Sequence, residues 1–204
     1  MILYDSVGPN PRVVRMFAAE KGIALEKKPV DIMAGENRQE PYLKLHPGGT
    51  TPLLVLDDGT PLSETTAICE YLEELQPNPP LIGTTPLERA KVRMLVRQID
   101  LLITAPMTSG FRGAEGRPMF EPRMRVIRAE AADDLKAMAA DGLAAIERQV
   151  GNTDWLLGPR FTLADIVLFS FVEFGGLVGQ PLHPSLAKLA AWRDRVAARP
   201  SAAA

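Results

Sequence analysis

Short apolar runs and segments of helical periodicity alternate along residues 1–75. Two of the apolar runs flank Asp58-Gly59, a dipeptide typical of tight hairpin turns. Apolar side chains three and four positions apart, such as those of Val13, Val14 and Phe17, predict helices between the runs. The predicted strands are 1–5, 25–32, 53–56 and 60–62, and the predicted helices are 10–22, one within 35–45, and 65–75. The order β-α-β-α-β-β-α predicts an α/β unit.

From residue 87 onward the pattern is helical throughout. Thr85 to Glu88 and Thr162 to Asp165 both read as capping boxes, which mark helix starts. The first box opens a long helix that Pro106 is expected to disturb. The second opens an apolar helix containing IVLFSFVEF, which should be the buried core, so Asp165 is assigned to folding. Two more helices are predicted, over 122–150 and from 185 to about 198, and the tail from Ala197 is expected to fray.

A proline-rich stretch separates these two parts of the chain. Residues 76–86 contain four prolines, a composition typical of a linker. The predicted organisation is a first domain at 1–76, a linker at 77–86 and an all-helical second domain at 87–204.

Composition excludes several classes of function. The net charge of −2 gives no basic field for nucleic acid or an anionic membrane. No apolar run approaches the roughly 20 residues of a spanning helix, and residues 1–11 lack the basic start of a secretory signal. The single cysteine, Cys69, allows no intramolecular disulfide and fits a reducing, cytoplasmic compartment; its place on an apolar helical face predicts a core role. With two histidines and no HExxH, CxxC or Gly-rich phosphate loop, metal and nucleotide chemistry are disfavoured.

Pro52 stands directly before the predicted strand 53–56. Proline is tolerated at a strand start, so a trans bond is the simple interpretation. Only about one X-Pro bond in twenty is cis in folded proteins, and the sequence alone does not predict a cis Thr51-Pro52 bond. A cis bond would turn the Thr51 backbone outward, toward an extended peptide ligand.

Two motifs resemble the glutathione-binding half of glutathione S-transferases, including bacterial members. They are HPGGTTP at 46–52, followed by the hairpin, and LSETTAI at 62–68 with Tyr71-Leu72; residues 161–165 resemble the capping box and staple of that family. The resemblance covers essentially the whole chain. It implies a thioredoxin-like N-terminal domain followed by an all-α C-terminal domain. The implied function is that of a glutathione transferase, which activates its co-substrate glutathione as a thiolate for attack on a small electrophilic substrate, by conjugation or by reduction of a peroxide or mixed disulfide. The resemblance also implies a cytoplasmic homodimer with a detoxification role. His46, Thr51 and Thr65 stand where the family usually has asparagine, valine and serine.

The resemblance also implies which residues bind glutathione. Thr51 and Pro52 would present the backbone, Glu64 would accept from the γ-glutamyl ammonium, and Thr65 at a helix start would bind the γ-glutamyl carboxylate. The alternatives are a helix N-cap for Thr65 and a solvated loop carboxylate for Glu64. Three more candidates follow from the family. Lys44 and His46 would bind the glycyl carboxylate, and Asp100 would bind the γ-glutamyl ammonium of glutathione held by a neighbouring subunit. The alternative for Lys44 and Asp100 is an exposed, solvated side chain.

A transferase must also supply a hydrogen-bond donor to the glutathione thiolate. Lowering a thiol pKa by about two units needs roughly 2.7 kcal/mol, and one hydrogen bond to a charged group supplies about 1.5–3 kcal/mol. The family keeps this donor between the first strand and the first helix, where Asn10 is the preferred candidate, followed by Ser6 and then Tyr4. Asn10 before Pro11 is equally explained as a helix N-cap, and Tyr4 as a strand residue that packs against the second domain.

The acceptor pocket would come from the helical domain. The candidates are Met107, Phe111 and Arg112. Met107 and Phe111 are four residues apart on one helical face, which core packing explains equally well. Arg112 would suit an acidic co-substrate. Two rival functions remain: a non-catalytic member of the fold that binds proteins, and a glutathione-dependent isomerase or ether-cleaving enzyme. The GPNP at 8–11 matches the SSCS motif of the serine-type isomerases poorly.

Overall fold

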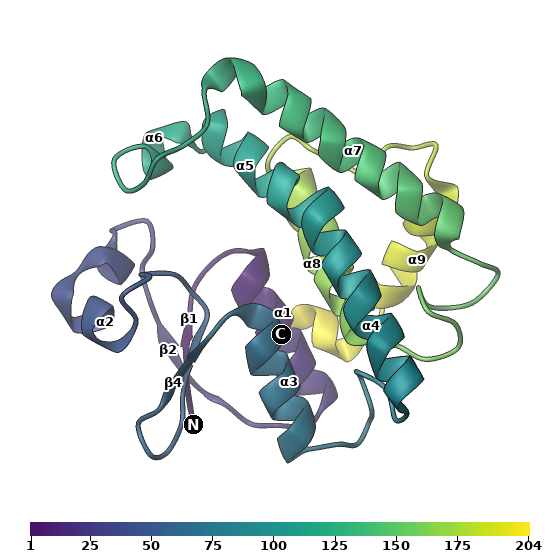
Figure 1. Cartoon of the computed structure of the whole chain (residues 1–204), viewed down its shortest axis with the longest axis horizontal. Coiled ribbons are helices and arrows are strands. Elements are labelled where there is room, and N and C mark those ends of the chain that lie inside the picture. The colour runs from purple at the N-terminus through teal and green to yellow at the C-terminus, as the bar shows by residue number, and fades with distance from the viewer. The chain divides into compact units, whose positions relative to one another are not determined.

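The computed structural model describes all residues from 1 to 204 and divides into two compact units (Figure 1). The N-terminal unit comprises residues 1–80 together with 200–204, and the helical unit comprises residues 81–199. The change of unit at 80/81 lies inside the proline-rich stretch. None of the helices combines the length and the apolar character needed to cross a membrane.

The N-terminal unit is built around a mixed four-stranded sheet in the order β2-β1-β3-β4. Strand β1 pairs in parallel with β2 and antiparallel with β3, which forms the predicted hairpin with β4. The order of strands and helices predicted from the sequence is confirmed. The elements are β1 (Ile2–Asp5), α1 (Pro9–Glu20), β2 (Glu26–Pro29), the 3₁₀ helix η1 (Glu36–Arg38), α2 (Glu40–Leu45), β3 (Leu53–Val55), β4 (Pro61–Ser63), α3 (Thr65–Leu75) and the 3₁₀ helix η4 (Pro200–Ala203).

The two faces of the sheet carry different helices, α1 and α3 on one and α2 on the other (Figure 1). Side chains alternate between the faces along β1. Leu3 is fully buried, and Asp5, two residues on, forms an ion pair with Arg15 of α1 at 2.6 Å, so both point to the α1 face. Tyr4 points to the α2 face, where it packs against a small core of Tyr42, Val30 and Leu53.

Helix α1 begins earlier than the sequence suggested. Gly8 occupies the N-cap with φ 122°, a backbone conformation that glycine adopts without cost, and Pro9 rather than Pro11 begins the helix. Asn10 is therefore inside the first turn and is not a cap. Thr65 is likewise inside its helix and is not a cap, because Glu64 is the N-cap residue of α3 and Thr65 its first helical residue. The N-cap interpretations of Asn10 and Thr65 are both wrong, and their side chains are available for other contacts.

The final residues of the chain pack against α1. Arg12 and Arg15 donate to the carbonyls of Ala202 and Ala204 at 3.0 and 3.2 Å. Ser201 is buried and donates to the Glu20 carboxylate at 2.5 Å. The expectation of a frayed tail is wrong because these side chains, which lie far away in the sequence, hold it.

A buried ion pair joins α1's end to α3. Lys21 and Glu73 are both almost fully buried and form an ion pair, and the Lys21 ammonium also donates to the Pro79 carbonyl at 2.5 Å. Buried charges are tolerated only when they are paired and hydrogen-bonded.

The helical unit contains α4 (Pro86–Ile99), the π-helical turn η2 (Asp100–Thr104), α5 (Ala105–Gly113), α6 (Arg117–Phe120), the 3₁₀ helix η3 (Ala129–Ala131), α7 (Ala132–Gln149), α8 (Leu163–Leu177) and α9 (Ala187–Ala197). The disturbance expected near Pro106 is the π-helical turn. Proline has no N–H to bond to the carbonyl of Leu102, four residues earlier. A Cβ at Gly142 of α7 would lie only 2.3 Å from that carbonyl oxygen, so glycine lets α7 approach the turn closely.

The helix predicted over 122–150 is wrong in its first part. Helix α7 begins only at Ala132, after a stretch without regular helix at 121–128. That stretch carries Arg123, Arg125 and Arg128, and positive charges are unfavourable in a first helical turn. Asp133 and Asp134 instead occupy the first turn of α7, where carboxylates are favourable.

Both predicted capping boxes are confirmed, and the second is deeply buried. Thr162 and Asp165 cap each other at the start of α8. The Asp165 carboxylate also accepts from the Leu156 backbone N–H at 3.0 Å and from the Trp192 indole N–H at 2.9 Å. Burial raises the pKa of Asp165 despite these hydrogen bonds. One carboxylate thus joins α8, α9 and the loop before α8.

Candidate functional site

The N-termini of α1 and α3 meet at one point of the N-terminal unit. The Thr65 hydroxyl, at the first residue of α3, donates to the Asn10 side-chain carbonyl at 3.3 Å. Neither helix has a side-chain cap or an acidic residue in its first turn. Pro9 and Pro11 carry no backbone N–H, so in the first turn of α1 only Asn10 offers one, and most of the free N–H groups belong to α3. Together with the positive partial charges of both helix starts, they form the electrostatic setting that binds anions.

Asn10 keeps one donor free at this point. Its amide oxygen accepts from Thr65, and its amide N–H₂ has no hydrogen-bond partner within the chain. An amide held through its oxygen presents its nitrogen in a defined direction. The group is suited to donate to an anionic sulfur or oxygen of a ligand.

A second polar contact links the loop before α1 to the segment before β3. The Ser6 and Thr51 hydroxyl oxygens are 2.5 Å apart. Only one of the two hydroxyl protons can lie between these oxygens. When Thr51 supplies it, the Ser6 hydroxyl donates to the Val7 carbonyl oxygen at 3.3 Å. Thr51 was expected to contribute only its backbone, so this side-chain contact was not predicted. The Thr51-Pro52 bond is cis, which the sequence alone did not predict. The Asn78-Pro79 bond is cis as well.

Three side chains hold the segment that leads to Thr51. The buried Asn37 donates to the Gly49 carbonyl at 2.6 Å, and the Tyr42 hydroxyl donates to the Thr50 carbonyl at 2.6 Å. His46 contributes a hydrogen bond between its Nε2 and the Thr50 hydroxyl at 2.8 Å. Burial, with a smaller contribution from Tyr4, raises the pKa of Tyr42 to about 12, so its hydroxyl stays a donor at neutral pH.

Arg15 is a further site-forming residue that the sequence did not reveal. Its guanidinium forms the ion pair with Asp5 and also lies 3.4 Å from the Ser6 carbonyl oxygen. It therefore fixes the loop that carries Ser6. The only sequence signal was an arginine inside a helix whose neighbours are apolar, and that signal does not name its partner. Asn37 and Tyr42 were missed for the same reason, since their partners are backbone carbonyls.

Glu64 has an unusual backbone. It is the only residue other than glycine with a positive φ, 69°, in a region where non-glycine residues cost on the order of 1–3 kcal/mol. Its exposed carboxylate forms no ion pair within the chain. Such a backbone conformation is typical of sites where geometry is kept for a ligand.

The remaining N-terminal candidates lie apart from this point. The Tyr4 ring stacks edge-on to Tyr42 at 5.8 Å on the α2 face of the sheet, which is not the face that α1 covers. Lys44 forms an exposed ion pair with Glu40 at 3.4 Å on α2. The thiol of Cys69 is fully buried, and burial, followed by Glu70 and Glu73, raises its pKa, so its predicted core role is confirmed.

The candidates in the helical unit are mostly engaged with their own unit. Asp100 pairs with Arg97 at 2.5 Å and accepts from Thr104 at 2.9 Å. Met107 is buried and packs closely on α8, since a Cβ placed at Gly175 would lie 3.0 Å from the Met107 Cε. This is the core role that its helical spacing also allowed.

Phe111 and Arg112 belong to an aromatic cluster of the helical unit. The Phe111 ring contacts Phe174 and Phe120 edge-on, with centroids at 5.4 and 6.0 Å. The Arg112 guanidinium lies over the Phe120 ring at 5.1 Å. The cluster joins α5, α6 and α8, and it gives Arg112 a fixed position.

A mixed four-stranded sheet with α1 and α3 on one face and α2 on the other, followed by a helical unit, is a thioredoxin-like fold with a C-terminal helical domain. Residues 7–75 match the family model "Glutathione S-transferase, N-terminal domain", and residues 105–200 match "Glutathione S-transferase, C-terminal domain". The chain belongs to the glutathione S-transferase family.

Individual relatives agree with this assignment. The chain is 30% identical to "Glutathione S-transferase 2" of Saccharomyces cerevisiae over 98% of its own length and 87% of the relative's. It is 32% identical to "Maleylacetoacetate isomerase" of Pseudomonas aeruginosa over 76% of its length and 71% of the relative's. Among solved structures, a glutathione S-transferase domain-containing protein from Marinobacter aquaeolei superposes with a TM-score of 0.91 at 34% identity, covering 98% of this chain and 99% of the other.

Proposed function

We propose that this chain, a glutathione transferase with glutathione as its co-substrate, binds and activates glutathione where the N-termini of α1 and α3 meet. The γ-glutamyl carboxylate accepts from the free backbone N–H groups at the start of α3. On binding, the Thr65 hydroxyl turns its single proton from Asn10 to this carboxylate. The γ-glutamyl ammonium binds the unpaired carboxylate of Glu64. The backbone of Thr51 pairs with the extended tripeptide, and Lys44 and His46 bind its glycyl carboxylate. The observation that carries this proposal is the Asn10–Thr65 hydrogen bond, because it brings two uncapped helix starts together.

The thiolate is proposed to lie against Asn10. A charge-assisted hydrogen bond from the Asn10 amide supplies about 1.5–3 kcal/mol, and a helix N-terminus adds about 0.3–1 kcal/mol. Together they are enough to lower a thiol pKa by about two units. Ser6 is the second candidate: when Thr51 donates to it, the Ser6 hydroxyl proton can turn from the Val7 carbonyl oxygen, 3.3 Å away, to the thiolate. The thiolate then attacks an electrophilic carbon; the new S–C bond displaces a leaving group, or the product carbanion takes up a proton.

Asn10→Ala is expected to raise the pKa of bound glutathione by about one to two units, because the thiolate loses its charge-assisted donor. The measurement is the thiolate absorbance of the glutathione complex against pH. Ser6→Ala is the matched comparison from the same loop, with a smaller expected shift. If Ser6→Ala raises the pKa and Asn10→Ala does not, the thiolate donor is Ser6.

Thr65→Val and Glu64→Gly are expected to weaken glutathione binding by roughly tenfold each, since each removes a hydrogen bond to a charged group of the ligand. Glu64→Gly should leave thermal stability unchanged or raised, because glycine adopts the positive φ of this position freely. Glu64→Ala is its control, with the same loss of affinity and retained backbone strain. Calorimetry with glutathione and melting curves separate these effects. Unchanged affinity in Glu64→Gly would contradict the assigned role of this carboxylate.

The electrophile is proposed to bind to the helical unit near Phe111 and Arg112, with Met107 behind them. Asp100 is proposed to reach the glutathione ammonium of a neighbouring subunit in a homodimer. A cytoplasmic location and a role in detoxification complete the proposal. The single buried cysteine supports the location, because it fits a reducing compartment.

A second candidate activity rests on the similarity to the Pseudomonas isomerase. An isomerase uses the same thiolate for addition and then eliminates it, so glutathione is regenerated. Consumption of glutathione with a panel of electrophiles distinguishes conjugation from isomerisation. A non-catalytic, protein-binding role would instead be indicated if the chain is not retained on immobilised glutathione.

A further inference from the structure

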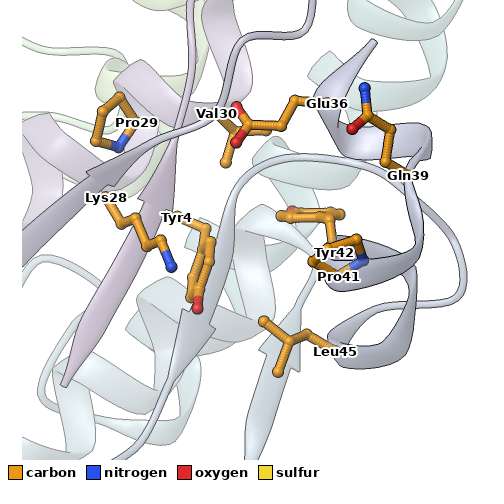
Figure 2. Close-up of a pocket in the computed structure, with 9 residues that line it drawn as sticks. All are labelled: Tyr4, Lys28, Pro29, Val30, Glu36, Gln39, Pro41, Tyr42 and Leu45. Atoms are coloured by element: carbon orange, nitrogen blue, oxygen red, sulfur yellow. The ribbon is translucent and has the colours of Figure 1, made fainter.

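A small cavity of about 130 Å³ lies on the α2 face of the sheet, between β1, β2 and α2 (Figure 2). None of the residues Ser6, Asn10, Thr51, Glu64 and Thr65 lines it. An apolar cavity of about 150 Å³ holds one benzene ring, so this volume matches a ligand with a single six-membered ring.

The walls of the cavity suit an aromatic ring. Figure 2 shows Lys28 and Tyr4 together on one side, and Tyr42 and Pro41 on the opposite side, with Leu45 below. The two tyrosine rings are held edge-to-face at 5.8 Å. Tyr42 is fixed further by its hydrogen bond to the Thr50 carbonyl. Rigid aromatic and apolar walls bind a ring with little loss of side-chain entropy.

The polar groups of the cavity suit a carboxylate. The Lys28 ammonium lies 5.1 Å from the Tyr4 ring centroid and forms no ion pair within the chain. The Tyr4 hydroxyl has no hydrogen-bond partner within the chain. The one carboxylate in the lining, that of Glu36, accepts from the Asp31 backbone N–H at 2.7 Å. Besides the Gln39 amide, the donors of the lining without partners are a cation and a phenol, and these two lie on the same side.

We propose that this cavity is a second ligand site, separate from the glutathione site, and that it binds a single-ring aromatic carboxylate. The ring packs against the Tyr4–Tyr42 pair, Pro41 and Leu45. The carboxylate accepts from the Lys28 ammonium and the Tyr4 hydroxyl. This site does not depend on where glutathione binds, and it would remain if the glutathione assignments were wrong.

The probe is sodium benzoate, titrated by calorimetry at constant ionic strength into the wild-type chain. One site with a dissociation constant on the order of 1 mM is expected for a ligand of this size. Acetate, which has the carboxylate without the ring, should bind at least about tenfold more weakly. The benzoate constant should be the same with saturating glutathione present, since the two sites are separate.

Lys28→Met tests the carboxylate contact, and Lys27→Met is its matched control. Both lysines are exposed on β2, but alternation along the strand places Lys27 opposite Leu3 and Lys28 opposite Tyr4. Lys28→Met should weaken benzoate binding by about fivefold or more, and Lys27→Met should leave it unchanged.

Three results would overturn the proposal: no benzoate binding up to about 20 mM, equal weakening by the two lysine variants, or displacement of benzoate by glutathione. Failure of glutathione to bind, with benzoate binding intact, would overturn the glutathione proposal and leave this one standing.

Discussion

Replacing Asp165 with alanine is expected to lower the free energy of unfolding of the helical unit by about 4 kcal/mol. The Asp165 carboxylate is fully buried and accepts from Leu156, Thr162 and Trp192, so its removal leaves several buried donors without partners. Both tryptophans, Trp155 and Trp192, lie in this unit, which makes tryptophan fluorescence in urea its natural probe.

The matched control for Asp165 is Glu88, the acidic partner of the other capping box. Glu88 makes the same motif at the start of α4, but its donors are exposed to water. Glu88→Ala should therefore cost much less than Asp165→Ala. Equal losses in the two variants would show that burial of the Asp165 network contributes nothing beyond the helix cap.

Glu73→Leu is expected to destabilise the N-terminal unit by about 3–5 kcal/mol, because it leaves the Lys21 ammonium buried without its counter-charge. The double variant Lys21→Met/Glu73→Leu should recover most of that loss, since it replaces the ion pair by apolar contacts of similar volume. The measurement is urea unfolding followed by far-ultraviolet circular dichroism, with tryptophan fluorescence reporting separately on the helical unit.

The single variant Lys21→Met completes the comparison. If the double variant loses as much stability as the two single variants added together, this view of the Lys21–Glu73 pair is contradicted. A matched surface comparison is Lys44→Met, which breaks the exposed pair with Glu40. Exposed pairs of this kind contribute little, about 0–1 kcal/mol. The contrast between the two pairs isolates the effect of burial.

Local signals in the sequence predicted much of the fold. Both capping boxes, at Thr85 and Thr162, were predicted because their partners are three residues apart. The hairpin at Asp58-Gly59 and the π-helical disturbance before Pro106 follow from the same kind of short-range chemistry. The family motifs added the overall architecture, which the comparisons confirm.

What the sequence did not predict falls into two groups: helix starts set by backbone conformation or charge, and contacts between distant residues. The start of α1 at Pro9 follows from the positive φ of Gly8, and the start of α7 from the position of acidic residues after an arginine-rich stretch. The contact between Ser6 and Thr51 spans 45 positions, and no local pattern signals it. The site residues were proposed from motifs alone, and the structure adds the neighbours that hold them, such as Arg15 and Tyr42.

The docking of residues 200–204 on α1 has a consequence for synthesis of the chain. The N-terminal unit is discontinuous: it is built from residues 1–80 and closed by a segment that follows the entire helical unit. Arg15, which fixes the Ser6 loop, donates to the carbonyl of Ala204. During translation, the sheet is made first but gains its last supporting contacts only when residue 204 leaves the ribosome, so the first unit begun is the last one completed.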